Sequence, residues 1–410
     1  MTKFLFKTEP SVYTRIIIPM KKRIVLFFSL LVVALVTFHC QDEDENKKIN
    51  SIVQSIKQRY APDNRTGIFS ITTERGFKSL LVKGEVDNEH AKDELIYSLF
   101  KEYTNIIDSV TLLPEKELGE YTWGIVTVSV MNMRTDPKES AELCSQALMG
   151  TVLRIWKKKG GWYYIQSQDK YLGWADGDQF FRCVKKNAEE WNTAQKVFVT
   201  TLHDVVREQP SAKSASVCDI VGGSVLKKIS VNGAWTQVAL GDGQLGFIPT
   251  SSAIEYAQWG KTLRPITENL ERTGKSLMGV PYLWGGTSVK GMDCSGFTRT
   301  VYLLNGLQLS RDASQQAYEG IDIPPGKEFE NLCEGDLLFF GKRAEGEKPE
   351  RITHVGMYLG NKIFIHSSGK VKLSSFDPTS KYYDEYNLKR FVRIRRVMPN
   401  LQKMEEVAVK

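Results

Sequence analysis

One cysteine stands where a glycine-rich loop meets a helix-forming segment. The loop and the start of the segment run from Gly279 to Phe297, and Cys294 directly follows Asp293. Apolar residues recur at helical spacing behind the cysteine, so we predict that a buried helix begins there, with Asp293 near its N-cap. The free N–H groups and the dipole of a helix N-terminus favour a thiolate and can lower the pKa of a cysteine. Cys294 is therefore our candidate nucleophile, in preference to a small buried apolar residue.

A cysteine nucleophile needs a base, and the sequence contains five histidines. Two of them, His354 and His366, lie in apolar, strand-like runs joined around Gly360 and Asn361, which predicts a β-hairpin. Side chains alternate along a strand, so the two rings share a face only if the loop has an odd number of residues, such as 360–362. We predict that odd loop, with His354 as general base and His366 as the group that orients it. The alternative is two strand histidines that are hydrogen bonded to backbone groups.

Six short blocks around these residues occur in an order that resembles the NlpC-type family of papain-like cysteine peptidases. The blocks are Pro281–Gly286, Asp293–Phe297, Leu309–Gln316, Glu334–Phe340, Thr353–Gly356 and Ile365–Ser367. The resemblance covers roughly residues 262–398. It implies bacterial enzymes that cut peptidoglycan stem peptides. It also implies an α+β fold in which a helix carrying the cysteine packs on an antiparallel sheet carrying both histidines.

The resemblance further implies roles for residues near the nucleophile. The bond to be cut is the γ-D-glutamyl–diamino acid bond, and no metal or other cofactor takes part. The oxyanion formed on attack is received by the backbone N–H of Cys294 and the hydroxyl of Tyr282. Asp293 and Ser295 line the site that holds the D-glutamate.

An internal repeat precedes this region, over about residues 121–258. Matching residues recur at a constant offset of 73 positions, namely Arg134/Arg207, Pro137/Pro210, Gly150/Gly223, Trp162/Trp235 and Trp174/Phe247. Within each copy, short runs rich in Val, Ile and Tyr are separated by Gly and Asp turns, which predicts a small β-barrel. The copies resemble bacterial SH3-like domains, which often accompany cell-wall hydrolases.

Only the first copy contains one particular polar pair. Glu142 and Tyr171 fall opposite Ala215 and Gln244 of the second copy. In the branch of the family that cleaves after a free L-Ala-γ-D-Glu dipeptide, the first SH3-like domain supplies an acidic residue and a tyrosine that close the substrate cleft. We therefore predict that Glu142, assisted by Asp312, binds the ammonium group of the substrate. The alternative is that Glu142 only solvates the surface of a barrel.

The N-terminal segment has the features of an export leader. A basic stretch beginning at Met20 precedes an apolar run from Ile24 to Phe38 that is short for a membrane span, and Cys40 follows it. This arrangement resembles a lipoprotein signal, although residues 37–39 are not the small residues usual before a lipidated cysteine. We expect lipidation at Cys40 and anchoring to a membrane, with a soluble periplasmic protein or an uncleaved anchor as alternatives.

These features divide the chain of 410 residues into five parts. The parts are a leader (1–40), a helical stabilising region (41–117), a first SH3-like barrel (118–190), a second one (191–260) and a papain-like domain (261–400). The stabilising region shows helical stretches over 49–60 and 93–107 and no pattern that carries chemistry. Much of the net charge of +7 lies in the leader, so no nucleic-acid-binding surface is expected. The six cysteines show no zinc-ligand spacing, and a Cys144–Cys183 bridge is conceivable.

The expected fold class is therefore α+β, and the expected protein is an exported, monomeric cysteine endopeptidase. Its substrates are stem peptides of peptidoglycan, in particular those with a free N-terminal L-Ala. Two alternatives remain, namely a broader murein hydrolase acting on intact peptidoglycan and a non-catalytic, wall-binding lipoprotein. An amidase or acyltransferase on the same scaffold is a further alternative.

Overall fold

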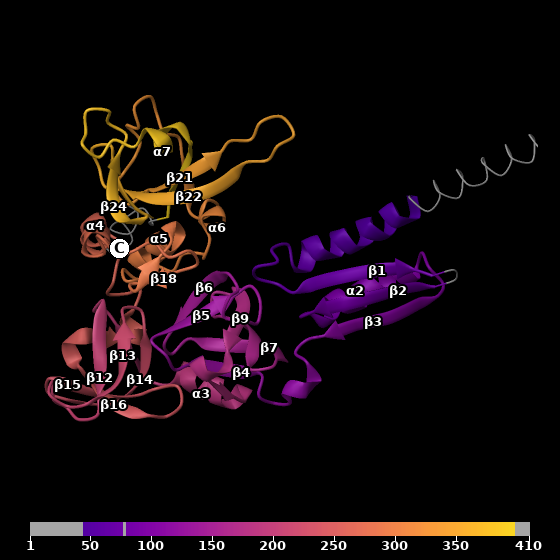
Figure 1. Ribbon diagram of the computed structural model, residues 1–410, viewed down its shortest axis with the longest axis horizontal. Helices are drawn as coiled ribbons and strands as arrows, with labels where there is room; N and C mark the ends of the chain where they lie inside the picture. The colour runs from indigo at the N-terminus through magenta and orange to yellow at the C-terminus, as the bar shows by residue number, and fades with distance from the viewer. Residues whose placement is uncertain (1–43, 77–78, 398–410) are drawn as a thin grey trace, which may run out of the picture. The chain divides into compact units, whose positions relative to one another are not determined.

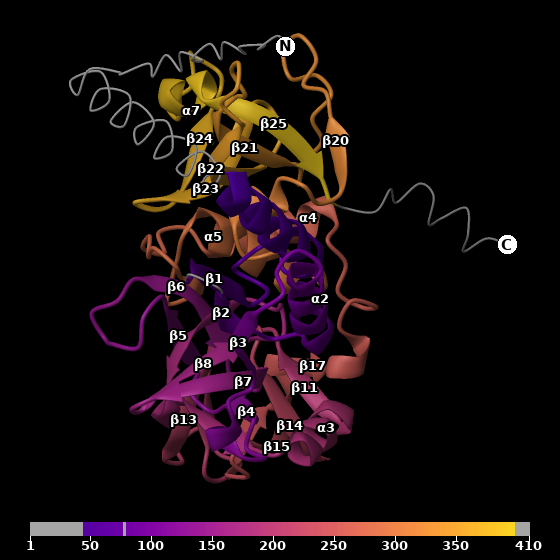
Figure 2. The ribbon, with the colours of Figure 1, turned by 90° about the vertical axis from the view of Figure 1, so that its right-hand side faces the viewer.

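The computed structural model describes residues 44–76 and 79–397, so the leader and Cys40 lie outside the described residues. The chain forms two compact units. One unit contains residues up to Tyr60 together with Ser70–Gly84 and Glu89–Val110, and the other contains Ala61–Phe69, Glu85–Asn88 and the chain from Thr111 onward. Figures 1 and 2 show the elements of each unit in two views. Within the described ranges, no helix combines the length and the apolar character needed to cross a bilayer.

The part of the chain before residue 113 combines helices with a small sheet. It contains a helix over residues 44–60, α2 (Glu89–Phe100), and a sheet in the order β1 (Phe69–Arg75), β2 (Leu80–Val86), β3 (Ile106–Leu112). The first predicted helix is confirmed. The second predicted helix, over 93–107, ends at Phe100 instead, and the sheet was not predicted. Leu80, Val82 and Val86 of β2 are buried at even spacing, as expected for one face of a strand.

The duplication is confirmed strand by strand. The first copy contains β4 (Trp123–Val126), β5 (Val130–Arg134), β6 (Leu143–Leu148), β7 (Val152–Lys159), β8 (Trp162–Gln166), β9 (Leu172–Asp176) and β10 (Phe180–Cys183). After α3 (Lys185–Thr193), the second copy contains β11 (Lys196–Val199), β12 (His203–Arg207), β13 (Ser216–Val221), β14 (Val225–Asn232), β15 (Trp235–Ala239), β16 (Leu245–Pro249) and β17 (Ala253–Glu255). Each strand of the second copy begins 73 residues after its counterpart. The hydrogen-bonded orders, β10-β4-β7-β8-β9-β5-β6 and β17-β11-β14-β15-β16-β12-β13, are equivalent.

The two sheets are open, which differs from the closed barrels expected. Within the described part of the chain, the end strands β10 and β6 of the first copy are not paired with each other. Strand β6 instead supports a loop of the C-terminal region. The side chain and the carbonyl oxygen of Gln146 accept hydrogen bonds from the N–H and the hydroxyl of Thr287, at 2.9 and 3.2 Å. The edge that would close a barrel thus positions the loop before Cys294.

The C-terminal region is a sheet covered by helices, which confirms the α+β class. Its antiparallel sheet has the order β20 (Ile321–Ile323), β25 (Phe391–Arg396), β21 (Leu337–Lys342), β22 (Arg351–Tyr358), β23 (Ile363–Ser368), β24 (Lys370–Ser375). The helices are α4 (Thr267–Ser276), α5 (Cys294–Leu303), α6 (Ala313–Gln316) and α7 (Glu385–Lys389), and a two-stranded ladder of β18 (Thr287–Ser288) and β19 (Gly291–Met292) leads into α5. Figure 1 shows α5 next to the sheet.

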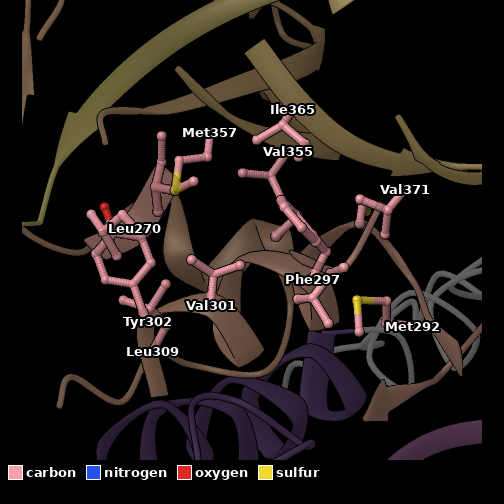
Figure 3. Close-up of a cluster of buried hydrophobic side chains, with 14 of the residues drawn as sticks. Leu270, Met292, Phe297, Val301, Tyr302, Leu309, Val355, Met357, Ile365 and Val371 are labelled. Carbon is pink, nitrogen blue, oxygen red and sulfur yellow. The ribbon is translucent and has the colours of Figure 1, made fainter. Parts of the chain in front are cut away.

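Both faces of this sheet are buried. On one face, Phe297 and Val301 of α5 pack in a core with Val355 of β22 and Ile365 of β23 (Figure 3). On the other face, residues such as Phe340, Phe364 and Phe376 form a second core. The second half of strand β22, from Val355 to Tyr358, therefore lies buried between two apolar layers, and His354 at its edge is half-buried.

Candidate active site

Cys294 is the first residue of α5, as predicted. The carboxylate of Asp293 caps the helix by accepting a hydrogen bond from the N–H of Gly296 at 2.7 Å. Position 296 requires glycine, because a Cβ there would come within 2.0 Å of the carbonyl oxygen of Gly286. The N–H of the first helical residue has no acceptor inside the helix. The backbone N–H of Cys294 is thus in a position to receive an anion.

The surroundings of the Cys294 thiol favour its neutral form. The residue is 8% exposed. Burial, followed by the negative charge of Asp293, raises the pKa of Cys294 to about 12, although the N–H of Val355 acts in the opposite direction. The prediction that the helix N-terminus lowers this pKa is therefore wrong in direction, because desolvation of a thiolate outweighs the helix dipole. Attack by this sulfur requires that a base takes the proton.

The two histidines lie on one face of the hairpin formed by β22 and β23. Tyr358 pairs with Phe364, and the loop consists of residues 360–362, all three with positive φ. His354 Nε2 and His366 Nδ1 are 2.7 Å apart. The odd loop is confirmed, and the histidines are in direct contact.

A serine on the neighbouring strand extends this contact into a chain of hydrogen bonds. His366, which is 0% exposed, places its Nε2 3.0 Å from the hydroxyl oxygen of Ser374 on β24. Asp384, the N-cap of α7, lies near this serine, and the Ser374 hydroxyl contributes to the low pKa of the Asp384 carboxyl. Sequence reasoning missed both residues, because neither lies in a motif and only the pairing of β24 with β23 brings Ser374 to the histidines.

The carboxylate of Asp384 favours one arrangement of the protons on the two rings. A carboxylate only accepts, so a Ser374 hydroxyl turned towards Asp384 accepts from Nε2–H of His366. The Nδ1 of His366 is then unprotonated and accepts from Nε2–H of His354. The lone pair of neutral His354 is left on Nδ1, the nitrogen that remains available to take a proton. Although burial acts in the opposite direction, hydrogen bonds from Asn387 and Ser374 hold the pKa of Asp384 below its ordinary value, so this end of the chain stays ionised.

Replacing Asp384 by Asn should lower the pKa of His354 further. Burial, with Arg390, lowers the pKa of His354 to about 4, while the charge of Asp384 partly opposes this shift. Removing that charge removes an interaction that favours the imidazolium, so His354 will stay neutral to a lower pH. Asn can still cap α7. The measurement is an NMR titration of the His354 ring, with Asp377→Asn, on a nearby turn, as control. An unchanged or higher pKa in Asp384→Asn would contradict the relay.

Tyr282 lies close to the candidate nucleophile. Burial, followed by the nearby Cys294, raises the pKa of Tyr282. Its backbone N–H donates to the carbonyl oxygen of Gly369 at 3.0 Å, which ties the loop before α5 to the end of β23. The hydroxyl therefore stays protonated at neutral pH and can donate a hydrogen bond near the sulfur.

Asp293 and Ser295 belong to a buried network around Arg311. Arg311, 2% exposed, donates to Asp293 at 2.6 and 3.2 Å and to the Ser295 hydroxyl at 3.0 Å. Asp293 also accepts from the N–H of Gly285 at 3.1 Å. The contacts of both residues are internal, and their contact with D-glutamate stays a prediction. The network fixes the start of α5.

The predicted ammonium-binding residues take part in two separate hydrogen-bonding groups. Tyr171 donates through its hydroxyl to Oδ2 of Asp312 at 3.1 Å. Glu142 accepts from the indole N–H of Trp284 at 2.6 Å, and Trp284 is 61% exposed. The first SH3-like copy thus reaches the C-terminal region at both places, and the joint role of Glu142 and Asp312 stays a prediction.

The segment Ala61–Phe69 contributes a residue that sequence reasoning missed. Arg65 donates to Oδ2 of Asp312 at 2.7 Å and to the hydroxyl of Ser314 at 2.9 Å, and its own orientation is held by Asp63 at 2.7 Å. Gln315 also donates to Asp63, at 2.9 Å. The region before residue 117 thus contacts Asp312, a predicted substrate-binding residue, and the expectation that this region carries no chemistry stays a prediction. Asp63 and Arg65 stand in no recognisable motif, so their sequence carried no signal.

The conceivable Cys144–Cys183 bridge is not formed. Both residues are free thiols. Cys144 donates to the carbonyl oxygen of Met133 at 3.2 Å, whereas Cys183 is buried in a different cluster that contains Trp191.

Comparisons with known proteins agree with this geometry. The NlpC/P60 family matches residues 279–396, and the bacterial dipeptidyl-peptidase SH3 domain matches residues 133–180. Dipeptidyl-peptidase 6 of Lysinibacillus sphaericus is 30% identical over 272 residues, which is 63% of this chain and 93% of that protein. A gamma-D-glutamyl-L-lysine dipeptidyl-peptidase of Bacillus cereus is 29% identical over 60% of this chain and 74% of its own length.

The fold has a counterpart among solved structures. A crystal structure of an NlpC/P60 family protein from Bacillus cereus covers 68% of this chain and all of that chain, with 24% identity and a TM-score of 0.59. This likeness concerns the fold. Together with the sequence matches, it shows that the chain belongs to the NlpC/P60 family of cell-wall cysteine peptidases.

Proposed function

We propose that this protein hydrolyses the γ-D-glutamyl–diamino acid bond of peptidoglycan stem peptides that have a free N-terminal L-Ala. The observation that carries the proposal is that two carboxylates, Glu142 and Asp312, are held by side-chain donors at segments adjoining α5. Oriented carboxylates favour a substrate with a free ammonium group. The name dipeptidyl-peptidase, which two relatives carry, supports recognition of a chain end.

The reaction begins with attack of Cys294 Sγ on the γ-carbonyl carbon while His354 Nδ1 takes the thiol proton. The oxyanion accepts hydrogen bonds from the N–H of Cys294 and the hydroxyl of Tyr282, and each such donor is worth about 2.7–4 kcal/mol in the transition state. His354 then gives its proton to the leaving amine, the C–N bond breaks, and a thioester remains. Water, deprotonated by His354, attacks the thioester and the proton returns to sulfur. His366 orients His354 throughout, and Asp293 and Ser295 shape the D-glutamate site.

A second function, hydrolysis of intact murein, is favoured by one observation. Glu142 and its partner Trp284 are both exposed to solvent. The two side chains that would close this end of the substrate site are therefore not fixed by packing. If the pair moves aside, a stem peptide still attached to glycan can enter. A non-catalytic wall-binding protein is disfavoured, because the chain has Cys294 at the start of α5 and a His354–His366 contact that such a protein does not need.

The proposal includes export and the domain division. A leader over 1–40 with a lipid on Cys40 would deliver a monomeric enzyme to its substrate in the cell envelope. The names of relatives that act on murein support that location. The remaining parts would be a stabilising region to residue 117, two SH3-like domains over 118–190 and 191–260, and a peptidase domain over 261–400.

Blocking the N-terminus of the substrate should abolish most of the cleavage. We expect L-Ala-γ-D-Glu-diaminopimelate to be hydrolysed and its N-acetylated form to have a kcat/KM lower by about 10- to 150-fold, since a charge-assisted hydrogen bond contributes about 1.5–3 kcal/mol. Glu142→Gln should reduce this difference, whereas Glu139→Gln, which removes an exposed acid of the same loop, should not. Equal cleavage of both peptides would favour the murein hydrolase. If neither peptide is cut, the substrate assignment is wrong.

A further inference from the structure

We infer that a basic groove beside His354 binds the carboxylates of the residue that leaves the reaction, so that diaminopimelate is preferred to lysine at this position. The inference rests on the proposed function. The leaving-group groove has a volume of about 660 Å³, and the lining residues that matter here are His354, Ser368, Lys372, Lys381, Asp384 and Arg390.

The groove adjoins the proposed catalytic residues at two points. One is His354, the proposed donor of a proton to the leaving amine. The other is Ser368, whose neighbour Gly369 accepts the hydrogen bond from the N–H of Tyr282. Because His354 lines the groove, a leaving residue whose amine meets His354 can extend its side chain and its carboxyl group into it.

The groove carries an excess of positive charge. Among the described residues, Lys372 and Lys381 form no ion pair. Arg390 donates to the hydroxyl of Thr353 at 2.5 Å and lies over the ring of Tyr386, 4.5 Å from its centroid, so its charge is also not neutralised by an acid. Asp384 is the acid in the described lining, and both of its oxygens accept hydrogen bonds from Asn387. Three cations without an acidic partner favour an anionic ligand.

The chemistry of the leaving residue supplies such anions. The carbon next to the leaving amine carries a carboxyl group, which is ionised when the residue is C-terminal. Diaminopimelate has a second carboxylate at its far end, where lysine has only an ammonium group. The cations of the groove attract the former and repel the latter. The groove thus discriminates between the two diamino acids by charge.

A bound carboxylate would also strengthen the base. Arg390 and Lys372 both contribute to the low pKa of His354. A negative charge placed beside them offsets their effect and raises that pKa towards neutrality. The anionic substrate then helps His354 to take the thiol proton, so part of the preference will appear in kcat as well as in KM.

The test uses three peptides that share L-Ala-γ-D-Glu and differ in the leaving residue. Meso-diaminopimelate has two carboxylates, L-lysine has one, and L-lysine amide has none. For the full chain we expect kcat/KM to fall by about tenfold at each step, which corresponds to about 1.4 kcal/mol per carboxylate. Lys372→Gln and Arg390→Gln should each flatten the series, and cleavage of the amide should not fall, because each variant removes a charge that lowers the pKa of His354. Lys327→Gln, which removes an exposed cation outside the groove, is the matched control.

The outcomes separate this inference from the function on which it rests. If the full chain cuts none of the three peptides, the proposed function is wrong. If it cuts all three equally, or if Lys327→Gln flattens the series as much as Lys372→Gln, the groove is not a carboxylate site. Should Arg390→Gln lose its fold, as judged by circular dichroism, the exposed Lys381→Gln takes its place. The same preference can be measured as binding. Titrating the inactive Cys294→Ala protein with each peptide gives a dissociation constant for each leaving residue.

Discussion

Replacing Cys294 by alanine should reduce hydrolysis by roughly 10⁶-fold, the scale found when the nucleophile of a catalytic triad is removed. The reason is that this thiol lies at the N-terminus of α5, beside a free backbone donor and the hydroxyl of Tyr282, and no other described thiol has this setting. The fold should persist, because the side chain loses only one buried sulfur. The measurement is the release of diaminopimelate from the free tripeptide, with circular dichroism as a check on folding.

Cys333→Ala is the matched control for this experiment. Cys333 is an exposed, free thiol in the loop before β21, and its replacement should leave turnover unchanged. Alkylation provides a second control. Because burial raises the pKa of Cys294, iodoacetamide should modify Cys333 first and leave activity largely intact at neutral pH. Turnover that survives Cys294→Ala would refute the assignment of the nucleophile.

Arg311→Met should destabilise the protein by about 3–5 kcal/mol. The guanidinium of Arg311 is buried and satisfies both oxygens of Asp293, and methionine would leave that carboxylate without its cation. Asp293 caps α5, so the loss should also disturb the position of Cys294 and lower kcat. Urea unfolding followed by tryptophan fluorescence measures the change in the free energy of unfolding.

An exposed ion pair provides the comparison for Arg311. Lys389 pairs with Glu385 on the surface of α7 at 2.8 Å, and Lys389→Met should cost less than about 1 kcal/mol. A loss below about 1 kcal/mol for Arg311→Met as well would mean that water reaches Asp293 and that the network is not closed.

The predictions that held are those that depend on local rules. Side-chain alternation and the loop 360–362 were enough to place His354 and His366 on one face. Hydrophobic spacing and an acidic N-cap were enough to begin a helix at Cys294. The offset of 73 residues predicted a duplication in which every strand has its counterpart. In each case the residues involved are close in sequence or are repeated, so the pattern can be read without knowledge of contacts.

The predictions that failed depend on distant contacts. The duplicated sheets were expected to close into barrels, but β6 uses its edge to hold Thr287. The pKa of Cys294 was expected to fall, but burial and Asp293 raise it. Neither effect can be predicted from neighbouring residues in the sequence. The pairing of an edge strand and the burial of a thiol both depend on which distant segments pack against them.

The sequence by itself determined the family resemblance, the nucleophile candidate and the order of the histidines, because each rests on residue type and short spacing. Only the tertiary structure decided which side chains complete the site. Arg65 reaches Asp312 across 247 positions, and the hydrogen-bond chain from His354 continues through His366 to Ser374, which lies on a separate strand. Hydrogen bonds of this kind form wherever folding brings a donor within about 3 Å of an acceptor, whatever their separation along the chain.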